Sequence, residues 1–200
     1  LDITDSSQVA TFFQDVVDQH GRLDALVNNA GLGQDVAAVV DLSDEQWDRV
    51  IRVTLTGTFY CCRTAGGIME RQESGSIVNI SSINGQNPAA LVAAYNVAKA
   101  GVISLTKTLA LELAAYSVRV NAVCPGPVYT DFNKKVMAQR CQSLGITEEE
   151  MAAVCDQLGC SDSDAFALCA APEWQAELAL EAVVHRARLA WHRIPQEVRN

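Results

Sequence analysis

The sequence contains no long apolar run and no signal-peptide pattern, although 49% of its 200 residues are hydrophobic. Both absences argue against a membrane-spanning or secreted chain, so we expect a soluble, cytoplasmic protein. Basic residues are also few: 15 lysines and arginines accompany 24 aspartates and glutamates, which leaves a net charge of −9. That charge argues against nucleic acid or an anionic membrane as a partner. The length is sufficient for one domain with a sizeable core.

The cysteines do not form the pattern of a disulfide framework. There are seven, an odd number, which favours a reducing compartment. Cys61 and Cys62 are adjacent on a predicted helix and Cys124 ends a predicted strand, so we interpret them as small core hydrophobes. The later cysteines and histidines match no usual zinc spacing, and we predict no metal site there. These residues are Cys155, Cys160, Cys169, His185 and His192.

Hydrophobic periodicity predicts an alternation of strands and helices. Continuous apolar stretches predict buried strands at about residues 23–28, 76–81 and 118–124. Amphipathic spacing predicts helices at about residues 6–21, 43–72 and 93–115. We expect Ser6 or Ser7 to cap the first helix, Gly21 to end it, and Ser43 with Gln46 to form a capping box for the second. This order indicates an α/β fold with a parallel sheet covered on both faces.

The run from Tyr95 to Lys99 is the most informative part of the chain. A spacing of four places tyrosine and lysine on one helix face, where the ammonium should lower the pKa of Tyr95 from about 10. Ser82 stands thirteen positions earlier, at the carboxyl end of a predicted strand. Ligands of open α/β sheets bind at that edge, and a hydroxyl there can hydrogen-bond an oxygen that gains charge. An isolated pair of this spacing is usually an ordinary surface pair, so the neighbouring motifs decide.

Together these residues resemble the short-chain dehydrogenase/reductase family. Four further stretches carry the resemblance, which runs from Leu1 to about Met151: Asn28–Gly31, Trp47–Phe59 with Leu55-Thr56-Gly57, Gly75–Ser82 and Val118–Thr130. The resemblance implies an NAD(P)-dependent oxidoreductase that interconverts a secondary alcohol and a ketone. It further implies NAD or NADP as cofactor, a small-molecule substrate, and a homodimer or homotetramer.

The resemblance also assigns roles to individual residues. Tyr95 is implied as general acid/base, Lys99 as the residue that lowers its pKa and holds the nicotinamide ribose, and Ser82 as the residue that orients the carbonyl. Thr54 stands where the family has an asparagine, so we expect an impaired proton relay rather than a dead one. Cofactor contacts are implied for Asp2, beside the adenine, and for Asn28, Ala30, Gly31, Tyr95, Lys99, Pro125, Gly126, Val128 and Thr130.

Both ends of the sequence depart from the family. The pattern Gly-x-x-x-Gly-x-Gly, which places a pyrophosphate at a helix N-terminus, is absent from these residues. We therefore expect residues 1–151 to form a partial Rossmann-type domain, an incomplete doubly wound parallel sheet without the glycine-rich first βαβ units. For residues 152–200 we expect a helical tail of unknown origin, with a diverged substrate lid as the alternative. A non-catalytic fragment, or a pseudoenzyme without cofactor binding, is the alternative to an active enzyme.

Overall fold

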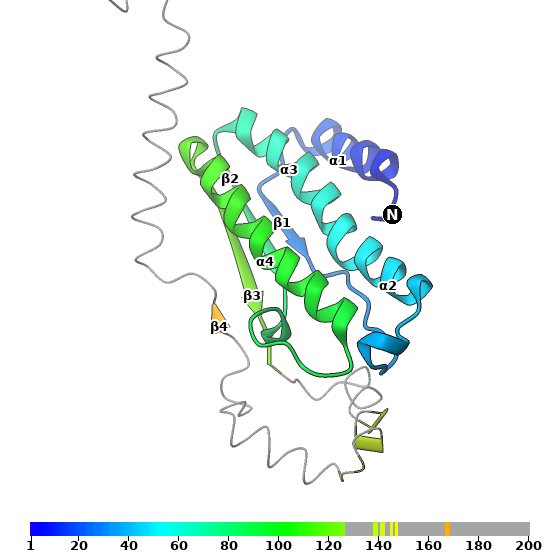
Figure 1. Cartoon of the computed structure of the whole chain (residues 1–200). Coiled ribbons are helices and arrows are strands. Elements are labelled where there is room, and N and C mark those ends of the chain that lie inside the picture. Colours follow the sequence, from blue (N-terminus) through cyan, green and yellow to red (C-terminus); the bar gives the residue numbers. More distant parts are fainter. Residues whose placement is uncertain (127–137, 140, 143–144, 146, 148–166, 169–200) are drawn as a thin grey trace, which may run out of the picture.

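The computed structural model describes residues 1–126 together with residues 138, 139, 141, 142, 145, 147, 167 and 168. A four-stranded sheet of order β1-β2-β3-β4 lies at its centre (Figure 1). The strands are β1 (Ala25–Asn28), β2 (Gly75–Ile80), β3 (Val118–Cys124) and β4 (Ala167–Leu168). The first three are parallel, and β4 is antiparallel to β3. The predicted parallel α/β fold is thus confirmed, with β3 at its predicted bounds.

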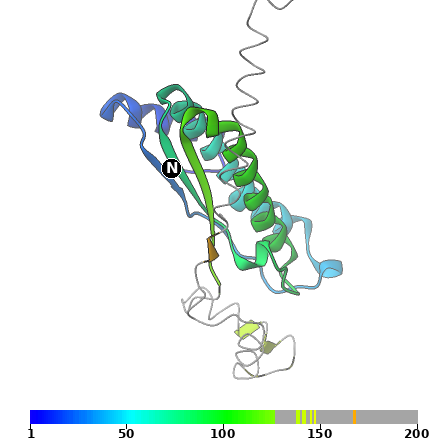
Figure 2. The same cartoon turned by 90° about the vertical axis from the view of Figure 1, so that its left-hand side faces the viewer.

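The long helices pack side by side on one face of this sheet (Figures 1 and 2). They are α1 (Ser6–His20), α3 (Thr58–Gln72) and α4 (Ala93–Leu113). The main core lies between them and the strands, where Val9 of α1, Met69 of α3 and Ile77 of β2 are fully buried. The sequence predicts helices on both faces, whereas the described helices cover one. Val27, on the other face of β1, is 61% exposed.

The helix ends show where the capping predictions succeed and fail. Asp5, not Ser6 or Ser7, caps α1, because its carboxylate accepts the backbone N–H groups of Ser7 and Gln8 at 2.9 and 3.2 Å. A carboxylate at this position also complements the positive end of the helix. Gly21 ends α1 with φ at 78°, a conformation that glycine adopts without strain.

Half of the predicted capping box is present at α2 (Asp44–Ile51). The Ser43 hydroxyl accepts the Gln46 N–H at 3.3 Å. The Gln46 side-chain amide instead donates to the Asp35 carboxylate at 3.2 Å. The start of α2 is therefore tied to the loop that follows β1.

The helix expected over residues 43–72 is divided by a π-helical segment. This segment, η2 (Arg52–Gly57), joins α2 to α3 without a turn between them. Thr54 lies within it and is fully buried. Short π-helical stretches often mark functional sites, because the widened turn displaces backbone groups from their regular partners.

The remaining elements are short. They are the 3-10 helices η1 (Val39–Asp41), η3 (Ile83–Gly85) and η4 (Ala114–Tyr116). In the part of the chain that the structure describes, no helix has the length and apolar character needed to span a membrane. The helical tail expected for residues 152–200 falls outside the described residues, apart from the two that form β4.

Candidate active site

Ser82 and Tyr95 meet at the carboxyl end of β2. Ser82 comes two residues after β2, and its side chain is close enough to the Tyr95 hydroxyl to lower the pKa of that group. The Ser82 hydroxyl also accepts the Asn84 N–H at 3.2 Å, which caps η3 and holds the serine in place. Tyr95 is the third residue of α4, so the strand end and the helix start both position this pair. The structure therefore brings together two of the residues that the sequence singles out.

Lys99 lies one turn further along α4 and is held by the backbone of β2. Its Nζ donates to the Ile80 carbonyl at 2.7 Å, and only 5% of the residue is exposed. The Ser81 hydroxyl donates to the Lys99 carbonyl at 2.8 Å, so side chain and backbone are both fixed. Burial lowers the pKa of Lys99 to about 8 because a charged ammonium loses hydration there.

The pKa of Tyr95 differs from the expectation. The sequence predicts that Lys99 lowers it, whereas burial of the ring raises the pKa, and the hydrogen bond to Ser82 opposes that rise. The Lys99 Nζ lies 5.7 Å from the Tyr95 ring centroid and is directed to the Ile80 carbonyl. The desolvation of the phenol therefore outweighs the neighbouring amine.

Thr54 ties the π-helical segment to the loop after β1. Its hydroxyl accepts the Leu32 N–H at 2.9 Å and donates to the Leu32 carbonyl at 3.2 Å. Its own carbonyl accepts the Thr58 hydroxyl at 2.8 Å. Gly31 lies beside this clamp: a Cβ at that position would come within 3.4 Å of the Lys99 Nζ and 3.7 Å of the Thr54 side chain. Thr54, Gly31 and Lys99 thus surround one small space.

Asn28 belongs to a buried polar network beneath the site. Its amide donates to Asn79 Oδ1 at 2.8 Å, and Asn79 in turn donates to the Thr106 hydroxyl at 2.8 Å. Asn28 and Asn79 are register partners on β1 and β2, and Thr106 lies on α4. The network joins both strands to the helix that carries Tyr95. Buried polar side chains need hydrogen-bond partners, and the register of β1 against β2 places Asn28 next to Asn79.

The other candidate cofactor residues lie at different places. Pro125 follows β3, and its carbonyl accepts the Ile83 N–H at 3.0 Å, which links the end of β3 to the Ser82 loop and places Gly126 next to it. Ala30 is exposed. Asp2 is exposed near the chain start, where bonds from the Thr4 N–H and hydroxyl lower the pKa of its carboxyl. Val128 and Thr130 lie outside the described residues.

The described cysteines have a structural environment. Cys61, Cys62, Cys124 and Cys141 are buried, and no disulfide joins these four residues. Burial raises the pKa of Cys62 to about 12, so this thiol stays neutral and is not a nucleophile at physiological pH. Among the described residues, no three metal-ligating side chains gather. The five cysteines and histidines considered for zinc between residues 155 and 192 lie outside that part of the chain.

Two groups that hold Lys99 escape analysis of the sequence. The Ser81 hydroxyl looks like part of the strand end, and the Ile80 carbonyl is main chain, so neither gives a signal. Only the packing of α4 against β2 reveals that both are directed at the same lysine.

Comparison with known proteins gives consistent results. A family profile described as "short chain dehydrogenase" matches residues 1–141. D-beta-hydroxybutyrate dehydrogenase of Rhizobium meliloti is 41% identical over 150 residues, which cover 75% of this chain and 58% of that protein. The 3-oxoacyl-(acyl-carrier-protein) reductase FabG of Thermotoga maritima is 44% identical over 138 residues, 68% of this chain and 55% of the relative. The chain thus spans between half and three fifths of the length of these relatives.

Solved structures show the same likeness. An NAD+-bound xylitol dehydrogenase superimposes with a TM-score of 0.68 at 34% identity, covering 70% of this chain and 55% of that one. ElxO with NADP bound gives a TM-score of 0.68 at 33% identity, with 77% and 60% coverage. Both sequence identities are high enough to indicate a common family as well as a common fold.

Proposed function

Because the chain belongs to the short-chain dehydrogenase family, we propose that the whole protein is an NAD(P)-dependent oxidoreductase that interconverts a secondary alcohol and a ketone. One observation carries this proposal: the Ser82 side chain and the Tyr95 hydroxyl interact at the carboxyl end of a parallel strand, with Lys99 one helical turn away. A hydroxyl pair of this kind can both bind and protonate a carbonyl oxygen.

The space beside Gly31 supports a role for a nicotinamide cofactor. A Cβ there would fill the gap next to the Lys99 Nζ and the Thr54 side chain, so glycine keeps it open. Lys99 and Tyr95 would hold the nicotinamide ribose, and Asn28, Ala30 and Gly31 would lie near the adenosine, as the family resemblance implies. Asp2, Pro125, Gly126, Val128 and Thr130 complete the set proposed for the cofactor. When bound, a reduced nicotinamide supplies the hydride that the substrate carbon accepts.

The side chains of the site then handle the substrate oxygen. Ser82 donates a hydrogen bond to the carbonyl and fixes its orientation. The Tyr95 hydroxyl gives its proton to that oxygen as the carbon accepts the hydride, which yields the alcohol and a Tyr95 phenolate. Lys99 stabilises the phenolate, which later takes a proton from solvent. A phenol with a raised pKa keeps its proton at neutral pH, which suits reduction of the ketone.

Replacement of Tyr95 tests this mechanism in the whole protein. We expect Tyr95→Phe to lower kcat for NADH- or NADPH-dependent ketone reduction by roughly 10²–10⁴-fold, the range for loss of a general acid. Tyr60→Phe removes the same hydroxyl from a tyrosine on α3, outside the candidate site, and serves as the matched control, with unchanged turnover. A Tyr95→Phe enzyme that retains its turnover would place the acid elsewhere.

A second candidate is a non-catalytic chain, either a fragment or a pseudoenzyme that does not bind a cofactor. Thr54 at the place of the family's asparagine favours it. The two candidates separate in a panel assay of ketones and alcohols with both cofactors. Turnover that depends on Tyr95 supports the enzyme, and the lack of turnover and of cofactor binding in the whole protein supports the second candidate.

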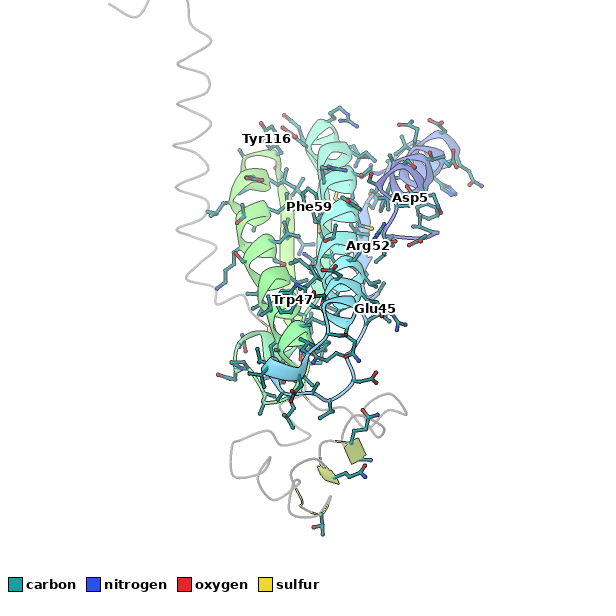
Figure 3. The ribbon with its side chains drawn as sticks, turned by 45° about the vertical axis from the view of Figure 1, so that its right-hand side comes forward. Asp5, Glu45, Trp47, Arg52, Phe59 and Tyr116 are labelled. Atoms are coloured by element: carbon teal, nitrogen blue, oxygen red, sulfur yellow. The ribbon has the colours of Figure 1, made fainter. Side chains whose placement is uncertain are left out.

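We further propose that the protein forms a homodimer, or a homotetramer built from it, through the outer side of α3 and α4. A groove of about 460 Å³ runs between these helices, lined by residues that include Phe59, Arg63, Gly67, Glu112 and Tyr116. Figure 3 labels Phe59 and Tyr116 on this side of the molecule. The groove carries both an arginine and glutamates, so a two-fold partner can pair opposite charges across it.

Gly67 offers a clean test of that interface. A Cβ at Gly67 meets only the tip of Arg71, at 3.7 Å, so the monomer accommodates a side chain there. We expect Gly67→Arg to convert the oligomer to monomer in sedimentation experiments, while Gly67→Ala leaves it intact. An unchanged mass for Gly67→Arg would rule out this surface.

For location we propose the cytoplasm, because reducing compartments maintain free thiols such as Cys61 and Cys62.

A further inference from the structure

The helix that carries Tyr95 begins without a capping side chain of its own. Val92 occupies the N-cap position of α4 and has no side-chain oxygen. The first backbone N–H groups of a helix have no partner inside it and are normally satisfied by a Ser, Thr, Asp or Asn at the N-cap. Tyr95 is the third residue of α4, so its N–H is one of these groups. The first intrahelical bond, from the Asn96 N–H to the Val92 carbonyl at 3.0 Å, forms one residue later.

Gln34 supplies the missing acceptor from a distant part of the chain. Its Oε1 accepts the Tyr95 N–H at 3.2 Å, across a separation of 61 residues. Since a backbone N–H is only a donor, the atom that faces it must be the amide oxygen. Gln34 is 7% exposed, and such a buried amide requires partners for both ends. Its position in the sequence, in a loop after β1, gives no hint of this contact.

The other end of the Gln34 amide holds the loop that leads into α4. Its Nε2 lies 3.5 Å from the Leu91 carbonyl and 3.4 Å from the Asp35 carbonyl, both at the long end for hydrogen bonds. The Leu91 carbonyl also accepts the Ala37 N–H at 3.0 Å. Leu91 itself has φ at 67°, a left-handed conformation that a leucine seldom adopts without support from its surroundings. The loop before α4 is therefore held by the loop after β1.

From these contacts we propose that Gln34 is a positioning residue for Tyr95: it acts as a tertiary N-cap that fixes the first turn of α4 against the Ser82 loop. The Tyr95 side chain starts from the same residue whose N–H Gln34 holds, so a shift of that turn moves the hydroxyl away from Ser82. The catalytic part of this inference rests on the proposed oxidoreductase function. The capping part does not, and it is tested separately.

Two substitutions of Gln34 separate the oxygen from the rest of the side chain. Gln34→Met keeps the length and burial but removes the acceptor. Gln34→Glu keeps an acceptor for the Tyr95 N–H and adds a charge that suits a helix N-terminus, while its second oxygen replaces the Nε2 donor and faces the Leu91 and Asp35 carbonyls. Gln72→Met is the matched control. The Gln72 side chain also holds a distant backbone segment, through bonds of 2.8 Å with the Leu23 N–H and the Leu23 carbonyl, but it lies at the far end of α3.

The first readout is amide hydrogen exchange at Tyr95, measured by NMR on the 200-residue chain. We expect Gln34→Met to speed exchange at Tyr95 about tenfold, the effect of losing one cap. Gln34→Glu should retain the protection, and Gln72→Met should leave Tyr95 unaffected. Unchanged exchange in Gln34→Met would overturn the capping contact, whether or not the protein is an enzyme.

The second readout is the position of the Tyr95 hydroxyl. Because the Ser82 bond lowers the pKa of Tyr95, its weakening in Gln34→Met should raise that pKa further, as measured by titration of a 13C label on the tyrosine ring. In the active whole protein, kcat should fall about tenfold in Gln34→Met with little change in KM, and Gln34→Glu should restore it to within about twofold. Faster exchange with an unchanged Tyr95 pKa and kcat would reduce Gln34 to a structural cap and refute the positioning role. If the wild-type protein has no turnover, the proposed function fails, and exchange and titration still decide the positioning role.

Discussion

Replacement of Lys99 by methionine should change how the stability of the protein depends on pH. Lys99 is 5% exposed, and burial lowers its pKa from 10.5 to about 8. The folded protein therefore releases this proton at lower pH than the unfolded chain does. The free-energy cost of burying the charged amine is fully present below about pH 8 and disappears as the pH rises towards 10.5. The lysine therefore makes the stability of the wild-type protein increase with pH in that window.

The size of the effect follows from the pKa. One pKa unit corresponds to about 1.4 kcal/mol, so a change from 10.5 to about 8 amounts to about 3 kcal/mol for the full titration. Between pH 7 and pH 10 the advantage of Lys99→Met over the wild type in unfolding free energy should fall by about 2.5 kcal/mol. Cys62 titrates in the opposite sense, but it is present in both proteins and cancels in the difference. The loss of the bond to the Ile80 carbonyl shifts the difference by a constant.

Urea unfolding under reducing conditions, followed by circular dichroism at several pH values, measures this difference. Lys107→Met is the control for the substitution itself, because Lys107 is an exposed lysine on the same helix. A difference between Lys99→Met and wild type that stays constant from pH 7 to pH 10 would refute the reasoning. It would mean that the Lys99 amine is hydrated in the folded protein.

Three further outcomes are expected. Thr54→Asn should leave kcat of the whole protein unchanged or raise it, because an amide can replace both bonds that the hydroxyl makes to Leu32; a tenfold loss, worth about 1.4 kcal/mol, would show a role specific to threonine. Gly85→Ala should lower the unfolding free energy by about 1–3 kcal/mol, because its Cβ would lie 2.8 Å from the Lys99 backbone; thermal unfolding measures this, with Gly67→Ala as the tolerated control. The 200-residue chain alone should show no saturable binding of NADH or NADPH below about 100 μM in calorimetry, since its sequence offers no glycine-rich turn for the pyrophosphate.

Local pattern was sufficient for the three parallel strands and the long helices, and for the choice of candidate site residues. Apolar periodicity located β3 and the bulk of α4, because period and length respond to the burial that each segment requires. The separation of Ser82, Tyr95 and Lys99 singled out the site, since spacing along a helix and placement at a strand end follow from chain geometry. The cap at α1 was displaced by one residue, because Asp5, Ser6 and Ser7 are all good capping residues and only the backbone decides among them.

What only the tertiary structure decided is how these residues are held and how they titrate. The sequence could indicate that Tyr95 and Lys99 share a helix face, but the pKa of Tyr95 depends on burial, which comes from segments distant in the chain. The contact of Gln34 with the Tyr95 N–H spans 61 residues, and the bond between Lys99 and the Ile80 carbonyl joins a side chain to a backbone group without a sequence signature. Desolvation and long-range hydrogen bonds arise from packing, and packing is a property of the folded chain as a whole.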